Sequence, residues 1–246
     1  METPGVSILI PLYNGVEYLE ESVSSVINQT YKKWQLIIGI NGHMNDLDFI
    51  EIVIERVKCL QQNLNKNDTD IMIKNYDTKG KSKTLNAMVI DTKYDLIAIL
   101  DVDDYWVDDK LESQVPYMQE YDVVGGKCQY FGDKEGIPEI PLGYILNYNI
   151  FSGNPIINSS VMIRKHDAIW DDPNYVQEVP GLDDYSLWFK LYYLKRKFYN
   201  IDKVLCLHRI HESSAFNNSN NDNVGLLRFL WGLYYLRGKF IRYTRK

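Results

Sequence analysis

Residues 96–104 read Leu-Ile-Ala-Ile-Leu-Asp-Val-Asp-Asp, and this stretch decides the fold. Five apolar residues in a row are typical of a short strand that is buried on both faces of a sheet. The strand runs directly into three carboxylates, Asp101, Asp103 and Asp104. Carboxylates this close repel one another, and partial burial is expected to raise the pKa of each. A divalent cation removes that conflict, and oxygen ligands on a loop suit Mg²⁺ or Mn²⁺. The alternative is a polar loop that partly caps a helix beginning near Asp108.

Upstream of this stretch, apolar runs alternate with apolar residues at helical spacing. The runs predict strands at 6–10, 34–40 and 71–73, and the spacing predicts helices at 19–27, 47–57 and 85–89. Such alternation predicts an α/β fold with a mostly parallel central sheet and helices on both faces. Because ligands bind beyond the carboxyl ends of such strands, we expect four polar strand ends to line one cleft. These ends are residues 13–14, 41–42, 75–77 and 101–104.

Downstream of Asp104 the alternation stops. Short strands are expected near 122–124, 127–131 and 159–163, and a helix is expected over about 184–194. We interpret the chain as a single domain over residues 1–215. Its nucleotide half covers about 1–104 and its acceptor half about 105–215. A polar loop and a basic, aromatic helix follow over residues 216–246.

The composition and charge of the chain exclude some classes of function. The chain has 246 residues and a net charge of −6, which does not suit a nucleic-acid binder. We see no signal peptide, and the apolar runs in the first 100 residues are far shorter than the roughly 18 residues needed to span a bilayer. The three cysteines have no metal-ligand spacing, so we expect buried, reduced thiols and a cytoplasmic location.

The C-terminal residues 226–246 mix basic side chains with Leu, Trp, Phe and Tyr. One interpretation is a helix that packs its apolar side on the domain and leaves its basic side in solvent. The other is peripheral contact with an anionic membrane surface or an acidic partner.

Three further motifs carry polar chemistry. Asp183 and Asp184 precede an apolar helix face, where they either cap the helix or supply a general base at a cleft. Arg209 and His211 are two residues apart on extended chain, so they project to one side and suit a diphosphate or a metal shell. Residues 79–83, Lys-Gly-Lys-Ser-Lys, open a helix as an anion site, but without the P-loop frame.

Taken together, these motifs resemble the family 2 glycosyltransferases of the GT-A fold group, over residues 6 to about 215. Residues 6–14 resemble the first strand and nucleotide-contacting loop of that family, and residues 100–104 resemble its Leu-Asp-x-Asp-Asp. Residues 183–188 are similar to its Glu-Asp-x-x-Leu-Trp motif, and Arg209 to Ser214 to its Arg-x-His-x-x-Ser segment. Residues 19–31 and 80–86 also resemble stretches of the family.

The resemblance implies metal-dependent transfer of a sugar, with inversion, from a nucleotide-sugar to the hydroxyl of a glycan or other acceptor. It implies that Asp184 is the general base, with Asp183 in the Glu position of the motif. Asp103 and His211 are implied as the residues that hold Mn²⁺ or Mg²⁺ on the diphosphate. Asp104 is implied to support the metal site without binding the cation directly. The implied nucleotide-sugar-binding residues are Pro11, Tyr13, Asn14, Asn41, Lys81, Asp101 and Arg209.

One departure concerns the nucleotide base. The family usually shows Asp-Asp-Gly-Ser-Thr-Asp after its second strand, whereas this chain has Asn41-Gly42. The amide of Asn41 both donates and accepts, so it can still pair with a pyrimidine edge. A UDP-sugar is favoured, with the choice of base open. Two alternatives remain at this point: a DxD-dependent phosphatase, with an Asp at a strand end as Asp101 is, and a catalytically degenerate nucleotide- or sugar-binding module.

Overall fold

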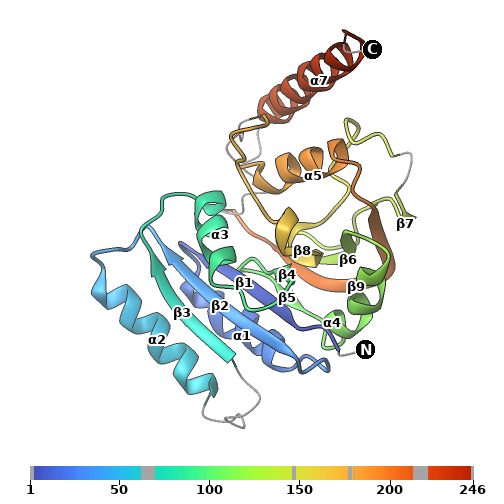
Figure 1. Ribbon diagram of the computed structural model, residues 1–246. Coiled ribbons are helices and arrows are strands. Elements are labelled where there is room, and N and C mark those ends of the chain that lie inside the picture. Colours follow the sequence, from blue (N-terminus) through green and yellow to red (C-terminus); the bar gives the residue numbers. More distant parts are fainter. Residues whose placement is uncertain are drawn as a thin grey trace.

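The computed structural model describes residues 3–61, 70–145, 148–176, 179, 181–212 and 221–244 (Figure 1). Four strands form the first part of its sheet: β1 (Val6–Leu12), β2 (Trp34–Asn41), β3 (Asp70–Tyr76) and β4 (Leu96–Ile99). They run parallel in the order β3-β2-β1-β4. Every residue of β1, β2 and β4 is buried, which explains their continuous apolar sequences.

Helices cover both faces of these strands, as expected. The 3₁₀ turn η1 (Val16–Tyr18) leads into α1 (Leu19–Ile27), which packs with α2 (Leu47–Gln61) against the side of β1 that carries Ile8 and Ile10. Helix α3 (Lys81–Ile90) packs against the opposite side, which carries Leu9. Residues 62–69, between α2 and β3, lie outside the described residues.

The second part of the sheet adds short antiparallel pairings to the expected parallel ones. Strand β8 (Met162–Arg164) pairs antiparallel with both β4 and β6 (Val123–Gly132). The long strand β9 (Phe198–Ile210) runs parallel to β6, but antiparallel to β5 (Tyr105–Trp106) and β7 (Gly143–Tyr144). The result is one mixed sheet in the order β3-β2-β1-β4-β8-β6-β9-β5, with β7 paired to β9. Only parallel pairs need long crossovers, and α5 (Asp183–Tyr193) lies in the connection from β6 to β9.

Short helical elements fill the connections of this second part. They are α4 (Lys110–Gln114), η2 (Val115–Gln119), η3 (Asn158–Ser160) and η4 (Lys165–Asp167). The two strands expected at 122–124 and 127–131 are a single strand, β6, with register irregularities around Lys127. The sequence predicts only extended chain around residues 209–211 here, because the buried and exposed residues of β9 do not alternate regularly.

Two of the three cysteines are buried free thiols, as expected. Cys128 and Cys206 are buried free thiols that lie opposite each other on β6 and β9. Cys59 is exposed on α2, which corrects the expectation that all three are buried. Within the residues that the structure describes, no helix combines the length and the apolar character needed to cross a membrane.

The C-terminal helix α7 (Asn221–Thr244) lies beyond α5 and projects away from the sheet (Figure 1). It is attached through Leu227 and Trp231, which are both buried. The Trp231 ring stacks on Phe189 of α5, with centroids 5.7 Å apart and planes 10° from parallel. The packing of an apolar side of this helix on the domain is thus confirmed.

This packing predicts a large stability effect. We expect Trp231→Ala to lower the free energy of unfolding by about 3–5 kcal/mol, because it removes a buried aromatic ring and leaves a cavity. Leu233→Ala, on the same helix but half exposed, should change it by less than about 0.5 kcal/mol. Urea denaturation followed by circular dichroism measures both. Equal effects of the two variants would contradict the docking of α7.

Candidate active site

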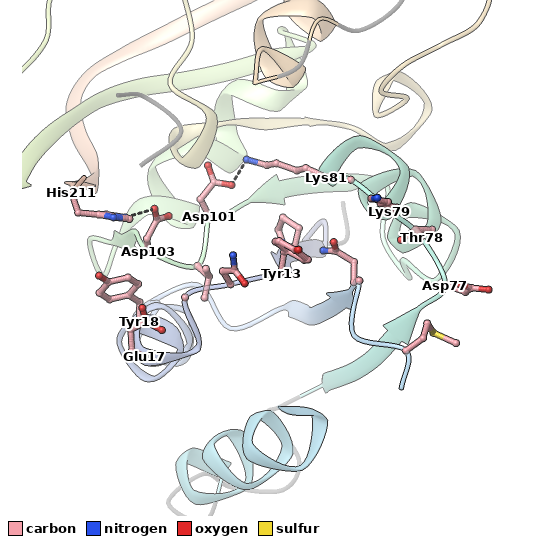
Figure 2. Close-up of a pocket in the computed structure, with 18 of the residues that line it drawn as sticks. Tyr13, Glu17, Tyr18, Asp77, Thr78, Lys79, Lys81, Asp101, Asp103 and His211 are labelled. Carbon is pink, nitrogen blue, oxygen red and sulfur yellow. Dashed lines mark hydrogen bonds and ion pairs between the residues drawn. The ribbon is translucent and has the colours of Figure 1, made fainter. Parts of the chain in front are cut away.

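A pocket of about 1080 Å³ lies at the carboxyl ends of the four parallel strands (Figure 2). All four expected strand ends contribute to it, together with the start of α3 and the end of β9. The expected site residues among its lining are Pro11, Tyr13, Asn14, Asn41, Lys81, Asp101, Asp103 and His211. The lining also includes Gly15, Glu17, Tyr18, Gly42, Met44, Asp77, Thr78, Lys79, Gly80, Val102 and His208.

The loops after β1 and β2 form one wall and hold each other in place. The His43 ring nitrogen Nε2 lies 2.5 Å from the Tyr13 carbonyl oxygen, and the His43 ring stacks on Phe49. Gly42 has a φ of 75°, and a Cβ there would lie 2.6 Å from the Tyr13 ring. Glycine is therefore required at this turn. Asn41 is buried beside it, at the end of β2.

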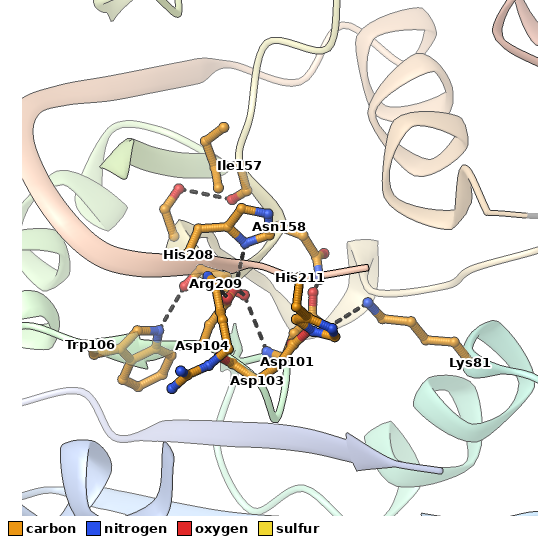
Figure 3. Close-up of polar contacts among 12 residues, drawn as sticks. Lys81, Asp101, Asp103, Asp104, Trp106, Ile157, Asn158, His208, Arg209 and His211 are labelled. Atoms are coloured by element: carbon orange, nitrogen blue, oxygen red, sulfur yellow. Dashed lines mark hydrogen bonds and ion pairs between the residues drawn. The ribbon is translucent and has the colours of Figure 1, made fainter. Parts of the chain in front are cut away.

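We call residues 101–104 the acidic loop (Figure 3). Its first three residues, Asp101, Val102 and Asp103, line the pocket. Asp101 accepts hydrogen bonds from Lys81 Nζ at 2.5 Å and from Asn158 Nδ2 at 2.9 Å. Burial alone would raise the pKa of Asp101, but the charge of Lys81 and these hydrogen bonds hold it below its ordinary value. This corrects the expectation that every carboxyl of the loop has a raised pKa.

Asp103 behaves as the sequence predicted. Burial raises its pKa, and the charges of Asp104 and Asp101 raise it further. His211 Nε2 lies 3.1 Å from Asp103 Oδ2, so β9 returns to the pocket beside the acidic loop. In the described part of the chain, no group of three or more His, Cys, Asp or Glu side chains is arranged to hold a metal ion. Asp103 supplies a carboxylate, the kind of ligand that suits Mn²⁺ or Mg²⁺, and the imidazole of His211 lies beside it.

Asp104 does not line the pocket and is buried. Its carboxylate accepts hydrogen bonds from Ser159 Oγ at 2.5 Å and from the backbone amide of Arg209 at 2.9 Å, and it contacts His208 Nδ1 at 2.8 Å (Figure 3). Burial would lower the pKa of His208, but the hydrogen bond and charge of Asp104 raise it to about 9. Asp104 therefore ties the acidic loop to β9 and to η3.

Arg209 does not line the pocket. Its guanidinium lies over the rings of Tyr18 and Phe131, 4.5 and 4.3 Å from their centroids, and it forms an ion pair with Glu21. Its Nε donates to the Asp103 carbonyl oxygen at 3.0 Å. Arg209 thus supports the acidic loop from outside the pocket, and its expected contact with the donor stays a prediction. Ser213 and Ser214 of the same motif lie outside the described residues.

Asp183 and Asp184 begin α5, and neither lines the pocket. Asp183 accepts a hydrogen bond from Ser82 Oγ at 2.7 Å, and Asp184 accepts one from Asn154 Nδ2 at 2.9 Å. Burial would lower the pKa of Lys81, but the charges of Asp101, Asp183 and Asp184 raise it above its ordinary value. Lys81 therefore interacts with carboxylates of both the acidic loop and the start of α5.

Several residues that shape this region were not expected from the sequence. Asn154, Asn158 and Ser159 come from the segment before β8, and each binds an aspartate far away in the sequence. Trp106 Nε1 donates to the Ser159 carbonyl at 2.7 Å and fixes that segment. A polar Asn/Ser cluster just before a strand was the one available hint.

The chain matches the family described as Glycosyl transferase family 2 over residues 7–172. It belongs to this family and is a glycosyltransferase. The match confirms the family expected from the motifs and removes the phosphatase alternative.

Among relatives, the Escherichia coli UDP-Glc:alpha-D-GlcNAc-diphosphoundecaprenol beta-1,3-glucosyltransferase WfaP is 28% identical, over 87% of this chain and 80% of that protein. An uncharacterized glycosyltransferase of Methanocaldococcus jannaschii is also 28% identical, over 85% of this chain and 72% of that protein. A longer uncharacterized glycosyltransferase of Rickettsia conorii is 26% identical, over 90% of this chain but only 36% of its own length.

Solved structures show the same fold. TarS 1–349 of S. aureus in complex with UDP-GlcNAc has a TM-score of 0.65 at 17% identity, over 88% of this chain and 61% of that chain. Mannosyltransferase PcManGT of Pyrobaculum calidifontis in complex with GDP-Man and Mn²⁺ has a TM-score of 0.63 at 13% identity, over 88% of this chain and 60% of that chain. These similarities confirm the GT-A fold.

The ion pair of His208 with Asp104 predicts a pH dependence of stability. The pKa of His208 is raised in the folded state to about 9, so its contribution is complete below about pH 6.5 and is lost as the pH rises through 9. Between pH 6.5 and 9.5, we expect wild type to lose on the order of 2 kcal/mol more free energy of unfolding than His208→Gln. Urea denaturation at both pH values measures this difference. Parallel losses in the two proteins would contradict the ion pair.

Proposed function

We propose that this glycosyltransferase moves a sugar from a nucleotide-sugar to an acceptor hydroxyl, with inversion and with the help of a divalent cation. The observation that carries the proposal is the pocket itself. Four parallel strand ends, the N-terminus of α3 and the end of β9 bring the polar residues of distant motifs around one space. Helix N-termini and lysines suit the phosphates of a donor, and Lys79, Gly80 and Lys81 all line this space.

The residues present fit Mn²⁺ or Mg²⁺ in this pocket. Asp103 and His211 would hold the cation, and donor phosphate oxygens and water would supply its other ligands. When bound, the cation would neutralise charge that develops on the leaving diphosphate. Asp101 is already bound by Lys81 and Asn158, so it is better suited to contact the nucleoside than the cation.

The proposed base is Asp184. Burial raises its pKa, which favours proton uptake, while the charge of Lys81 and the hydrogen bond from Asn154 act in the opposite direction. Asn154 also holds one carboxylate oxygen in place at 2.9 Å. Asp183, bound by Ser82, would orient the start of α5 or the acceptor. A base that deprotonates the acceptor on the side opposite the leaving group gives inversion.

A UDP-sugar is the favoured donor, and Asn41 is the residue proposed to pair with the nucleotide base of that donor. The names of the E. coli relative and of the TarS complex contain UDP-sugars, whereas the PcManGT complex contains GDP-Man. The acceptor is proposed to be a glycan or another hydroxyl compound, bound by the acceptor half, residues 105–215. Peripheral contact of the C-terminal helix with a membrane is part of this proposal.

A donor-hydrolysis screen tests the function. With Mn²⁺ present, we expect slow release of nucleoside diphosphate from a UDP-sugar, faster than from GDP- or dTDP-sugars, and loss of activity in EDTA. Asp103→Asn should lower Mn²⁺-dependent UDP affinity by about tenfold or more, because it removes a charged ligand. Asp48→Asn, an exposed change on α2, is the matched control.

Isothermal titration calorimetry with UDP and Mn²⁺ measures the affinities. Unchanged affinity in Asp103→Asn would overturn the metal assignment. Donor binding without turnover, across donors and acceptors, would instead support the degenerate binding module.

The two carboxylates of α5 are separated by kinetics. We expect Asp184→Asn to lower kcat by about 10²–10⁴ with donor affinity nearly unchanged, because a general base acts in the transition state. Asp183→Asn should mainly raise the acceptor KM, with a smaller loss in kcat. Steady-state kinetics with a working acceptor decides between them. A larger loss of kcat in Asp183→Asn would mean that the base is Asp183.

A further inference from the structure

The C-terminal helix α7 carries a row of exposed apolar side chains. Leu226, Phe229, Leu233 and Leu236 are 48%, 62%, 50% and 65% exposed. Their spacing of three, four and three residues places them on one face of the helix. We call these four residues the outer stripe. In the sequence, the same spacing continues to Phe240, whose side chain lies outside the described part.

The opposite face of α7 is already used. Leu227 and Trp231 are buried against the domain, and Leu230, Tyr234 and Tyr235 are packed against the same apolar cluster. The helix is therefore held by one face and leaves the outer stripe in solvent. Four large apolar side chains in a row on one exposed face are more than scattered surface residues, and such patches commonly mark interaction surfaces.

Charge shows which occupant suits this face. Residues 224–246 contain six basic and no acidic side chains. Because the whole chain has a net charge of −6, the remaining residues carry a net charge of −12. A symmetric contact between two copies through the stripe would bring two of these basic segments together, and their charges would repel. An anionic lipid surface accepts both the apolar stripe and the basic charge.

We propose that α7 lies in the surface of an anionic membrane, with the outer stripe inserted among the lipids. This deepens the proposed membrane contact and does not depend on the assigned chemistry of sugar transfer. In this orientation, Arg228 lies next to the acceptor side of the site. Its Nη2 donates to the Ser152 carbonyl oxygen at 3.1 Å, and its Nε contacts the Tyr185 hydroxyl at 3.4 Å. Ser152 and Tyr185 are close in sequence to Asn154 and Asp184, so the membrane would be near the place where an acceptor hydroxyl meets the base.

Co-sedimentation of the full chain with vesicles tests the proposal. One set contains phosphatidylglycerol mixed with phosphatidylcholine, and the other contains phosphatidylcholine alone. We expect binding to the anionic set at low salt and at least about tenfold weaker binding to the neutral set. Phe229→Ser combined with Leu233→Ser should weaken binding to the anionic vesicles by about tenfold or more, because two inserted side chains are lost.

The matched control is Ile52→Ser combined with Ile90→Ser, which changes two exposed apolar residues on α2 and α3. We expect it to bind as wild type does. Thermal unfolding of both double variants checks that they fold, and donor hydrolysis in solution should be unchanged in both. If the wild-type protein does not hydrolyse the donor, the proposed sugar transfer is contradicted. The vesicle-binding result would still test the membrane proposal.

Three results would overturn the membrane proposal. The first is no binding of wild type to anionic vesicles at low salt. The second is equal loss of binding in the stripe and control variants. The third is a wild-type dimer in sedimentation equilibrium that the stripe variant abolishes, which would assign the stripe to a second copy of the chain.

Discussion

The arrangement of the site depends on one buried carboxylate, that of Asp104. It binds the backbone of β9 at Arg209, the ring of His208 and the hydroxyl of Ser159, three groups that are far from it in the sequence. A buried carboxylate without such partners would be very costly, so these contacts restrict the acidic loop to one position. Asp101 and Asp103 then face the pocket, and His211 is brought beside Asp103.

Lys81 connects the two sides of the site in a similar way. It pairs directly with Asp101, and the charges of Asp183 and Asp184 act on it from the start of α5. One cation thus offsets the repulsion among carboxylates from two separate motifs. A donor phosphate that enters the pocket would meet this cation between the acidic loop and the proposed base. The spacing of motifs along the sequence gives no measure of this proximity.

Helices α5 and α7 connect the site to the surface of the molecule. Helix α5 begins at the proposed base and, further along, holds Trp231 of α7 through Phe189. Arg228 of α7 reaches back to the segment that supplies Asn154. The proposed acceptor side and the outer stripe are therefore parts of one packed unit, and a surface that binds the stripe would also orient the proposed acceptor side.

The sequence by itself determined the parallel half of the sheet, the helices on both faces, and the four polar strand ends that line one pocket. Those features follow from local periodicity and from a buried strand that ends in carboxylates. The pairing of strands in the second part of the sheet could not be predicted, because these strands are short or, like β9, have no clear period. Tertiary structure alone decided that Arg209 supports the acidic loop from outside, that Lys81 lowers the pKa of Asp101, and that Asn154, Asn158 and Ser159 hold the aspartates. Each of these depends on contacts between residues that are distant in the sequence, and such contacts exist only once the chain has packed.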